Sequence, residues 1–420
     1  MRIAIVGGGV AGIAAAYLIQ RIHQVSLYEK NDYIGGHTHT ITIPDGPDAG
    51  TPVDTGFIVF NDRTYPILNR LFCELGVSSR KSDMSFGYFH EKGGFQYATS
   101  NFNSLFAQRR NLLAPGYWSM LAEILLFNRL VRRRLQKDLL EGISLGQFLR
   151  RFRFSDRFRK QYLFPMVAAI WSAPDVDVGQ FPMLTFARFF DNHGLLTIHR
   201  HPQWYYVAGG SHTYVKAFLD QFQGEVYTRA DIVSIHRNTN GVILKHADGS
   251  TQPFDRVVIA THADEACQLL ADPSDDERRL LGTWRYSTNQ IYLHTDLAWM
   301  PSNPNAWASW NIIRGIHSDN RSPVTLTYHM NRLQQLKTRN QYLVTLNPFR
   351  PIAEEEVIAQ MTYTHPVFTF ESLRTQPELP DLNGVRNTFF CGSYFGYGFH
   401  EDAARSGVQV AAAMGVRHEL

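Results

Sequence analysis

Hydrophobic and polar positions follow several distinct periods along the chain. Residues 2–6 (RIAIV) form a short apolar run that ends at glycines, which is typical of a buried strand in a parallel sheet. Residues 11–21 then show helical spacing, and residues 24–28 predict a second strand. Later strands are predicted at 225–228, 257–260 and 389–391, and later helices at 212–222 and 402–414. Strands that alternate with helices in this way predict an α/β fold.

The segment between the first strand and the first helix is rich in glycine. Gly7-Gly8-Gly9-Val10-Ala11-Gly12 is a G-x-G-x-x-G motif, and its position between a strand and a helix gives it meaning. The first glycine permits a tight turn, the second lets the backbone approach a pyrophosphate, and the third lets the helix pack on the strand. The free N–H groups and the dipole of the helix favour the negative pyrophosphate. The predicted contacts are Gly7, Gly9, Val10, Ala11 and Gly12.

An acidic residue and a second glycine motif follow. Glu29 ends the second predicted strand, where a carboxylate accepts hydrogen bonds from both ribose hydroxyls and would repel a 2′-phosphate. Just beyond it, Gly35-Gly36-His37-Thr38 resembles the second FAD signature of the flavin amine oxidase and phytoene desaturase superfamily, where Arg usually stands in place of His37. The resemblance implies FAD as the cofactor. The residues that it assigns to FAD here are Glu29, Lys30, Gly35, Gly36, His37 and Thr38.

Three later segments agree with this resemblance. Asp54-Thr55-Gly56-Phe57 matches the strand and turn that pass near the flavin ring in the superfamily, and Val233 stands where the adenine is held by backbone contacts. The start of the last helix should point at the flavin pyrimidine, where reduction places negative charge. The resemblance thus implies further FAD contacts at Gly56, Phe57, Val233, Gly392, Ser393, Glu401 and Asp402.

Two insertions separate the nucleotide-binding stretches. The first is helical by pattern and rich in Phe, Trp and Arg, whereas the second contains strands at 290–295, 307–312, 324–328 and 342–346. The resemblance implies a mixed α/β fold: a Rossmann-like FAD-binding domain with an inserted substrate domain of helices and antiparallel sheet. The predicted FAD-binding domain comprises 1–65, 203–283 and 361–420, and the predicted substrate domain comprises 66–202 and 284–360.

Several segments resemble one branch of the superfamily more closely. They look like the FAD domain that precedes the methyltransferase in plant cyclopropane fatty acid synthases, and like its stand-alone bacterial relatives. This resemblance implies an unsaturated or methyl-branched acyl chain as the substrate and a lipid methyltransferase as a candidate partner. The segments are Ser82–Phe86, Leu145–Leu149, Ile170–Pro174, Pro202–Trp204, Gly210–Val215 and Gly396–Asp402.

Positive charge is concentrated in one part of the first insertion. Residues 105–160 hold 13 Arg or Lys and four acidic residues, a net charge of +9 in a chain whose total is +3. The cations stand beside aromatic and aliphatic residues, a combination suited to an anionic lipid surface. A core helix with a solvated arginine face, or a protein partner, would give the same pattern. Nucleic acid is excluded as a partner because no recognition motif accompanies the charge.

Two residues near the last helix are candidates for chemistry. The C-terminal motif brings Tyr397 and His400 to the edge of the flavin, and an imidazole can exchange protons near neutral pH. A hydrogen bond to the flavin or a helix cap is the alternative role for His400, and a rigid wall is the alternative for Tyr397. No lysine occurs between Lys245 and Lys337, although amine oxidases of the superfamily keep one near the flavin. Asn289, Gln290 and His294 are the polar residues there.

Composition limits the remaining function classes. Three separated cysteines, Cys73, Cys267 and Cys391, form no CxxC pair and exclude a disulfide framework. The pairs His37/His39 and His199/His201 have metal-ligand spacing, but no nearby carboxylate or cysteine completes either set, so no metal is expected. The glycines near the N-terminus would break a signal-peptide helix. We expect a cytoplasmic protein. The basic and apolar residues at 105–160 would further allow peripheral binding at the inner face of the membrane.

The leading hypothesis is an FAD-dependent oxidoreductase that removes hydrogen from, or adds it to, a lipid acyl chain. Three alternatives stay open: a flavin-dependent double-bond isomerase, an amine oxidase, and a non-catalytic FAD-binding subunit that presents lipid to a methyltransferase. The missing lysine argues against the amine oxidase.

Overall fold

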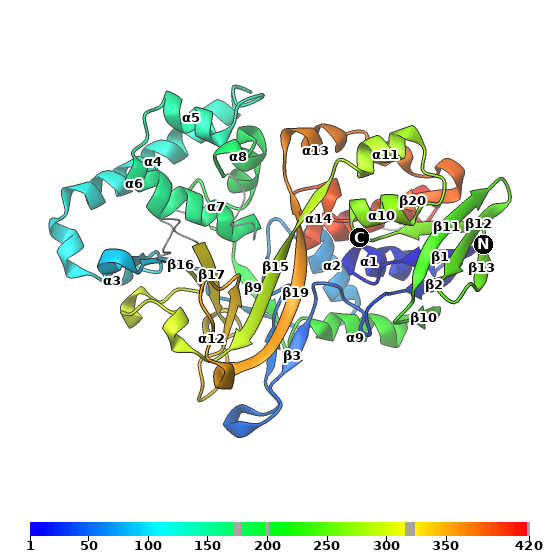
Figure 1. The fold of residues 1–420 in the computed structure, drawn as a ribbon, viewed down its shortest axis with the longest axis horizontal. Helices are drawn as coiled ribbons and strands as arrows, with labels where there is room; N and C mark the ends of the chain where they lie inside the picture. Colours follow the sequence, from blue (N-terminus) through cyan, green and yellow to red (C-terminus); the bar gives the residue numbers. More distant parts are fainter. Residues whose placement is uncertain (172–177, 198–200, 316–323, 418–420) are drawn as a thin grey trace.

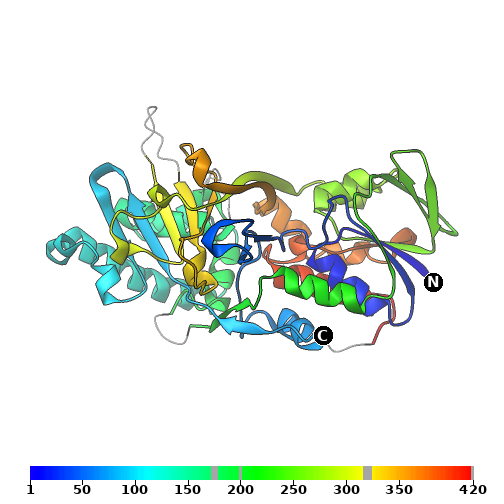
Figure 2. The same ribbon diagram turned by 90° about the horizontal axis from the view of Figure 1, so that it is seen from below.

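The computed structural model describes residues 1–171, 178–197, 201–315 and 324–417. Two parts lie side by side along the long axis of the molecule in both views (Figures 1 and 2). One part contains the N-terminal strand and the last helix, and the other contains most of the first insertion. The long strands β15 (Arg285–His294) and β19 (Val357–Val367) run between them (Figure 1). The mixed α/β architecture predicted from the sequence is confirmed.

The first part is built on a five-stranded parallel sheet. Its order is β10-β2-β1-β14-β20, so β1 lies in the middle, next to β2 and β14. The strands are β1 (Arg2–Val6), β2 (Gln24–Tyr28), β10 (Glu225–Tyr227), β14 (Arg256–Ile259) and β20 (Thr388–Phe390). Side chains along β1 and its neighbours, such as Ile5 and Val258, are fully buried, as expected for a sheet covered on both faces.

Helices pack on this sheet through small residues. The helices are α1 (Val10–Ile19), α9 (His212–Gln221) and α14 (His400–Ala413), which begin and end within a few residues of the predicted positions. The helices α1 and α14 approach so closely that a Cβ added at Gly407 would lie 2.3 Å from the carbonyl oxygen of Ala11. This close packing fixes where the N-termini of both helices lie.

A smaller antiparallel sheet flanks the nucleotide end. It contains β11 (Ile232–Asn238), β12 (Gly241–His246) and β13 (Thr251–Phe254), and the helices α10 (Ala263–Leu269) and α11 (Asp275–Leu281) follow it in the chain. The register between β11 and β12 shifts between Ile232 and Ser234. Val233 is therefore the extra residue of a β-bulge, and such a residue is left out of the hydrogen-bonded ladder.

The second part contains a seven-stranded sheet of order β19-β15-β18-β17-β16-β7-β8. Its other strands are β7 (Phe86–His90), β8 (Phe95–Ala98), β16 (Trp310–Arg314), β17 (Val324–His329) and β18 (Leu343–Leu346). The strands β7 and β8 correct the expectation that the first insertion is helical throughout, because β7 pairs in parallel with the distant β16. The predicted division into domains stays a prediction, and β19 runs through its boundary at residue 360.

The remaining helices and strands complete the frame of the molecule. The helices are α2 (Pro66–Glu74), α3 (Phe102–Leu105), α4 (Pro115–Leu135), α5 (Leu145–Arg151), α6 (Asp156–Phe158), α7 (Phe164–Trp171), α8 (Met183–Asn192), α12 (Met330–Leu333) and α13 (Phe370–Thr375). Small sheets join β3 (Thr40–Thr42) to β4 (Pro52–Asp54), and β9 (Trp204–Val207) to β5 (Phe60–Asn61) and β6 (Ser79–Lys81). Among the described helices, none is long and apolar enough to cross a membrane.

Candidate active site

A large cavity extends from the nucleotide-binding loop of the first part to the helices of the second. Its volume is about 1490 Å³, above the range of about 300–1,000 Å³ that is usual for small-molecule sites. One end is lined by Gly9, Glu29 and Val233, and the other by Ile124, Ile170 and Trp171. The cavity is therefore large enough for an extended cofactor at one end and a second molecule at the other.

The glycine loop leaves room for a phosphate group. Gly9 begins α1 with no side-chain cap, and a Cβ added to it would have no heavy atom within 4 Å. Gly35 donates from its N–H to the carbonyl oxygen of Gly8 at 2.9 Å, which holds the second glycine motif against the first. Val10 and Ala11 also line the cavity. A helix N-terminus without a side-chain cap, beside space that no protein atom fills, fits the pyrophosphate of FAD.

Acidic and backbone groups complete the nucleotide end. The buried carboxylate of Glu29 accepts hydrogen bonds from the backbone N–H of Gly8 at 2.8 Å and of Asn31 at 2.9 Å. It thus lies directly beside the loop, where a ribose would follow the pyrophosphate. Lys30 forms an ion pair with Glu265, and both residues line the cavity. The bulged Val233 offers a backbone free of the ladder, while its predicted contact with adenine stays a prediction.

The turn at Gly56-Phe57 is held by a buried carboxylate. Asp54 is fully buried and accepts hydrogen bonds from the N–H and hydroxyl of Ser211, both at 2.8 Å, and from the amide of Gln334. Burial raises the pKa of Asp54 to about 6, although the Thr40 and Ser211 hydrogen bonds act in the opposite direction. Asp54 thereby joins β4 to the start of α9 and to the end of α12.

Four histidines surround the middle of the cavity. The ring centroid of His37 is 5.2 Å from that of His365 and 6.3 Å from that of His262, and His400 also lines the cavity. Burial, and then the neighbouring His262, lowers the pKa of His37 to about 4. Burial, and then the neighbouring His37 and His262, lowers the pKa of His365 well below its usual value. These imidazoles are therefore neutral at physiological pH.

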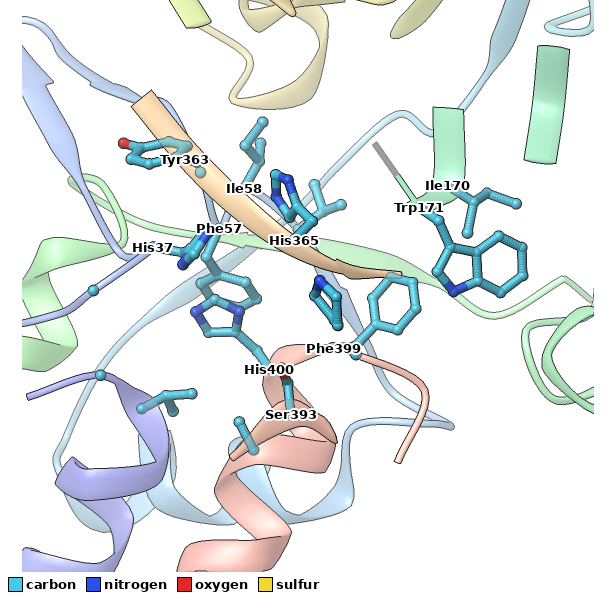
Figure 3. A pocket seen from close by; sticks show the side chains of 18 of the residues that line it. His37, Phe57, Ile58, Ile170, Trp171, Tyr363, His365, Ser393, Phe399 and His400 are labelled. Atoms are coloured by element: carbon cyan, nitrogen blue, oxygen red, sulfur yellow. The ribbon is translucent and has the colours of Figure 1, made fainter. Parts of the chain in front are cut away.

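The predicted catalytic residue His400 is part of this group. Its ring stacks on Phe57 at 4.0 Å between centroids, and its Nε2 lies 3.2 Å from the hydroxyl of Thr38. Burial, and then the neighbouring imidazole of His37, lowers the pKa of His400 to about 3. Figure 3 shows the ring of His400 against Phe57, with Phe399 to its side. Such an imidazole favours hydrogen bonding over proton exchange at neutral pH.

Five predicted site residues do not line the cavity. A Cβ on Gly12 would lie 2.0 Å from the carbonyl oxygen of Gly7, so Gly12 permits close packing of α1 on the loop. Thr38 is buried behind His400 and also lies 2.6 Å from the hydroxyl of Tyr214. Tyr397 is half-buried against Phe189, and Phe399 lines the cavity instead.

The two acidic residues at the start of α14 also have other partners. Glu401 accepts hydrogen bonds from the N–H groups of Ile67 and Leu68, both at 3.1 Å, and so caps α2. Asp402 accepts from the N–H groups of Tyr397 and Phe399 and caps α14 itself. Both carboxylates are buried, and burial raises their pKa. In this structure their hydrogen bonds hold the segment that carries His400. Neither residue lines the cavity, and their predicted contact with the cofactor stays a prediction.

The second end of the cavity is mainly apolar. Figure 3 shows Ile170 and Trp171 beyond Phe399, on the side away from His37. The inner face of α4 contributes Ile124 and Asn128 to the same end. Sequence reasoning missed His262 and His365 as members of the histidine group in the middle of the cavity, because neither lies in a motif. Further apolar lining residues are Phe86, Leu105, Met166, Phe189, Trp204 and Trp310.

No group of three or more potential metal ligands occurs among the residues that the structure describes. The rings of His37 and His39 have different neighbours, because His37 lies near His365 whereas His39 stacks on Tyr33. His199 and the segment Ser172–Pro174, both singled out in the sequence, lie outside the described residues.

Comparisons with known proteins agree with this geometry. A family model described as flavin containing amine oxidoreductase matches residues 10–340. A 1-hydroxycarotenoid 3,4-desaturase from Flavobacterium sp. (strain P99-3) is 34% identical over 94 residues, 22% of this chain, and the match spans 17% of that relative.

Solved structures cover nearly the whole chain. The cyclohexylamine oxidase from Brevibacterium oxydans IH-35A has a TM-score of 0.71 at 16% identity and covers 98% of both chains. The CLA-producing fatty acid isomerase from P. acnes has a TM-score of 0.63 at 16% identity, with 98% of both chains covered. At these identities the likeness establishes the fold.

Replacing the second glycine tests the nucleotide cradle. We expect Gly9→Ala to weaken FAD binding at least tenfold, about 1.4 kcal/mol, because the new methyl group occupies the space left for phosphate. The stability of the apoprotein should change by less than about 1 kcal/mol, since the methyl group meets no protein atom. Fluorescence titration with FAD and urea unfolding of the apoprotein measure the two effects.

Gly146→Ala is the control for this substitution, because Gly146 lies in α5 and does not line the cavity. Its Cβ would lie 2.8 Å from the carbonyl oxygen of Gly179. We expect a loss of about 1–3 kcal/mol in unfolding free energy with FAD affinity retained by the folded protein. Equal FAD affinity in Gly9→Ala and the unchanged protein would contradict the assigned cradle.

The buried imidazole of His400 predicts a pH-dependent stability. Its folded-state pKa of about 3 lies below the usual 6.5, so the unfolded chain binds a proton below pH 6.5 that the folded protein excludes. The stabilisation is present above pH 6.5 and is lost as the pH falls toward 3. From pH 7.5 to 5.5 this loss is about 1.4 kcal/mol.

His400→Gln removes the titrating group and keeps a side-chain amide for the Thr38 hydroxyl. In urea unfolding of the apoprotein at pH 7.5 and 5.5, the variant should lose about 1.4 kcal/mol less than the unchanged protein. The same loss in both proteins would show that His400 does not contribute to the acid sensitivity.

Proposed function

The chain belongs to the family of flavin-containing amine oxidoreductases and is an FAD-dependent oxidoreductase, and from this premise we propose that its substrate is a lipid acyl chain with a double bond or a methyl branch. The reaction class would be dehydrogenation or reduction of that chain. The observation that carries the proposal is the long, mainly apolar end of the cavity, which continues from the four histidines to the inner face of α4.

Different residues along the cavity would bind the cofactor and the substrate. FAD, when bound, supplies the redox chemistry. The α1 N-terminus and Gly9 would hold its pyrophosphate, and Glu29 its ribose, as derived above. Phe57 and His400 form a stacked wall at the middle of the cavity. Beyond them, Trp171 and Ile170 line the cavity, where they would exclude water and orient an apolar chain.

Lysine is absent from β15 and from its partner β19, whose residues 362–366 line the cavity. No residue of β15 itself lines the cavity. No lysine occurs between Lys245 and Lys337, and the described strand β15 carries Asn289, Gln290 and His294 as its polar uncharged candidates. Asn289 and His294 are buried. The amine oxidases of the superfamily keep a lysine near the flavin, so this chain departs from them at that position. We therefore prefer a carbon–carbon bond to an amine as the reacting group.

The resemblance to the plant cyclopropane fatty acid synthases supports the same substrate class. It also makes a lipid methyltransferase a candidate partner. The proteins of similar sequence or fold include one named as a carotenoid desaturase and one named as a fatty acid isomerase. A double-bond isomerase, or a subunit that presents lipid to a methyltransferase, remains the alternative that the next experiment separates.

Anaerobic mixing of the FAD-loaded protein with a bacterial membrane lipid extract tests the proposal. Loss of the visible flavin absorbance would identify lipid as the electron donor, and mass spectrometry of the lipid would identify the new double bond. Absorbance that stays unchanged while a double bond changes position would indicate the isomerase. Unchanged absorbance and unchanged lipid, also after chemical reduction of the flavin, would contradict an acyl substrate drawn from that extract.

A bulky residue in the apolar end should block the acyl chain without affecting FAD. We expect Ile124→Trp to lower kcat/KM for long acyl chains at least tenfold, because Ile124 lines the cavity. Leu139→Trp is the control, since Leu139 follows α4, does not line the cavity and is 54% exposed. Equal activity of the two variants on long and short chains would contradict the assigned acyl end.

We further propose that the outer face of α4 binds an anionic membrane surface. Trp118, Leu125 and Leu126 are each about half exposed on this face, and Leu113 before the helix is 87% exposed. The same face continues into Arg129, Arg132 and Arg133 in its last turns. Because the opposite face of α4 lines the cavity, a lipid bound outside would be close to the acyl end.

Vesicle flotation tests this surface. Vesicles with anionic lipid should carry the unchanged protein, and Arg129→Ser/Arg132→Ser/Arg133→Ser should lose most of this binding, since each cation near the surface contributes about 1 kcal/mol. Replacing three arginines of the opposite part, Arg256, Arg278 and Arg279, gives a charge-matched control. Binding that is the same with neutral vesicles would contradict the proposal.

A further inference from the structure

A line of polar side chains crosses the sheet behind the cavity wall. Strands β15 and β19 pair in antiparallel register, with Ser287 opposite His365, so that Asn289 lies beside the imidazole. Asn289 Nδ2 is 3.0 Å from His365 Nδ1, and Asn347 Nδ2 is 2.7 Å from Asn289 Oδ1. Asn289 is 1% exposed, so these contacts form in the interior of the protein.

One backbone group determines the direction of every hydrogen bond in this line. The N–H of Gln290 can only donate, and it lies 2.9 Å from Asn347 Oδ1, so this atom is the amide oxygen. The amide nitrogen of Asn347 then donates to the oxygen of Asn289. The amide nitrogen of Asn289 therefore donates to Nδ1 of His365, which must be an unprotonated acceptor.

The backbone at Asn347 supports this arrangement. Its φ is +48°, in the left-handed region that asparagine and aspartate adopt more readily than most residues. The N–H of Asn347 donates to the carbonyl oxygen of Gln290 at 2.8 Å, so main chain and side chain of Asn347 both bind the same residue. Two hydrogen bonds to Gln290 therefore hold Asn347, the first side chain of the line, in place.

The direction of these hydrogen bonds determines which ring nitrogen of His365 carries the proton. Burial and the neighbouring His37 and His262 keep the pKa of His365 well below its usual value, so the ring is neutral. A neutral imidazole with an accepting Nδ1 carries its hydrogen on Nε2. His365 lines the cavity among the other histidines, and its Nε2 has no hydrogen-bond partner within the described ranges.

We infer that His365 is a fixed hydrogen-bond donor to the ring system of bound FAD, with Asn347 and Asn289 setting its tautomer. The inference requires FAD binding alone and is independent of the acyl substrate. A donor fixed in a site that excludes water strengthens its bond to an acceptor as that acceptor gains negative charge. His365 would therefore stabilise the reduced cofactor relative to the oxidised one.

The first experiment measures the tautomer. Long-range ¹H–¹⁵N correlation spectra of the FAD-loaded protein, labelled at its 17 histidines, should show His365 as the Nε2–H form, with its resonances assigned by their absence in His365→Gln. In Asn347→Asp the added oxygen cannot donate, so Asn289 should turn its amide nitrogen toward residue 347 and its oxygen toward His365. The His365 resonances should then change to the Nδ1–H form.

Asn387→Asp is the control for this substitution. It makes the same change of charge at another asparagine with positive φ, 60°, away from the cavity lining. It should leave the His365 resonances unchanged. An Nδ1–H or doubly protonated His365 in the unchanged protein, or an Nε2–H form that persists in Asn347→Asp, would overturn the relay.

The second experiment measures the midpoint potential of bound FAD. His365→Asn places its amide near the Nδ1 position and loses the donor, so the potential should become more negative. His365→Gln can place an N–H near the Nε2 position, so it should restore most of the difference. Neither variant changes the net charge. An equal potential in the unchanged protein, His365→Asn and His365→Gln would overturn the inference. This holds also if only the KM for substrate changes, because His365 would then donate to the substrate and not to FAD.

Discussion

The site depends on backbone segments that touch without side chains between them. The loop at Gly7–Gly9 meets the second glycine motif through the hydrogen bond from Gly35 to Gly8. A Cβ on Gly36 would lie 3.2 Å from the Cα of Gly9, and one on Gly56 would lie 2.2 Å from the carbonyl oxygen of His37. These contacts stack the loop, the segment after β2 and the turn after β4 in one place. The distances among Glu29, His37 and Phe57 follow from that stacking.

The electrostatics of the cavity change along its length. Backbone N–H groups and the start of α1 provide positive potential at the nucleotide end, and Lys30 is the single Lys or Arg among the described lining residues. The middle is surrounded by imidazoles that burial keeps neutral. The acidic residues near His400 are engaged as helix caps. The middle of the cavity is therefore a low-charge region in which hydrogen-bond direction determines which charges are stabilised.

Local signals in the sequence predicted the strands of the parallel sheet and the position of the glycine loop. The glycine motif, Glu29 and the strands of the parallel sheet each occupy a few adjacent residues, and their conformations are determined by neighbours in the chain. The strand β7 was missed because its pairing partner β16 is far away in the sequence. His365 and Asn289 were not recognised as a pair because only the register of β15 and β19 brings them together. Glu401 and Asp402 stand where the motif places them, but nearby N–H groups engage their carboxylates.

The order of the strands in the parallel sheet has a consequence for folding during translation. The central strand β1 is made before its neighbour β14, which begins with Arg256, and the backbone of Arg2 binds Asp255, 253 positions later. The edge strand β20 follows β14 in the chain and emerges later still. Pairings this distant in sequence are slow to form, so the glycine loop lacks part of its supporting sheet until β14 and β20 have been made. Cofactor loading should accordingly follow the synthesis of β20, and the aromatic-rich first insertion is exposed to aggregation or chaperone capture in the interval.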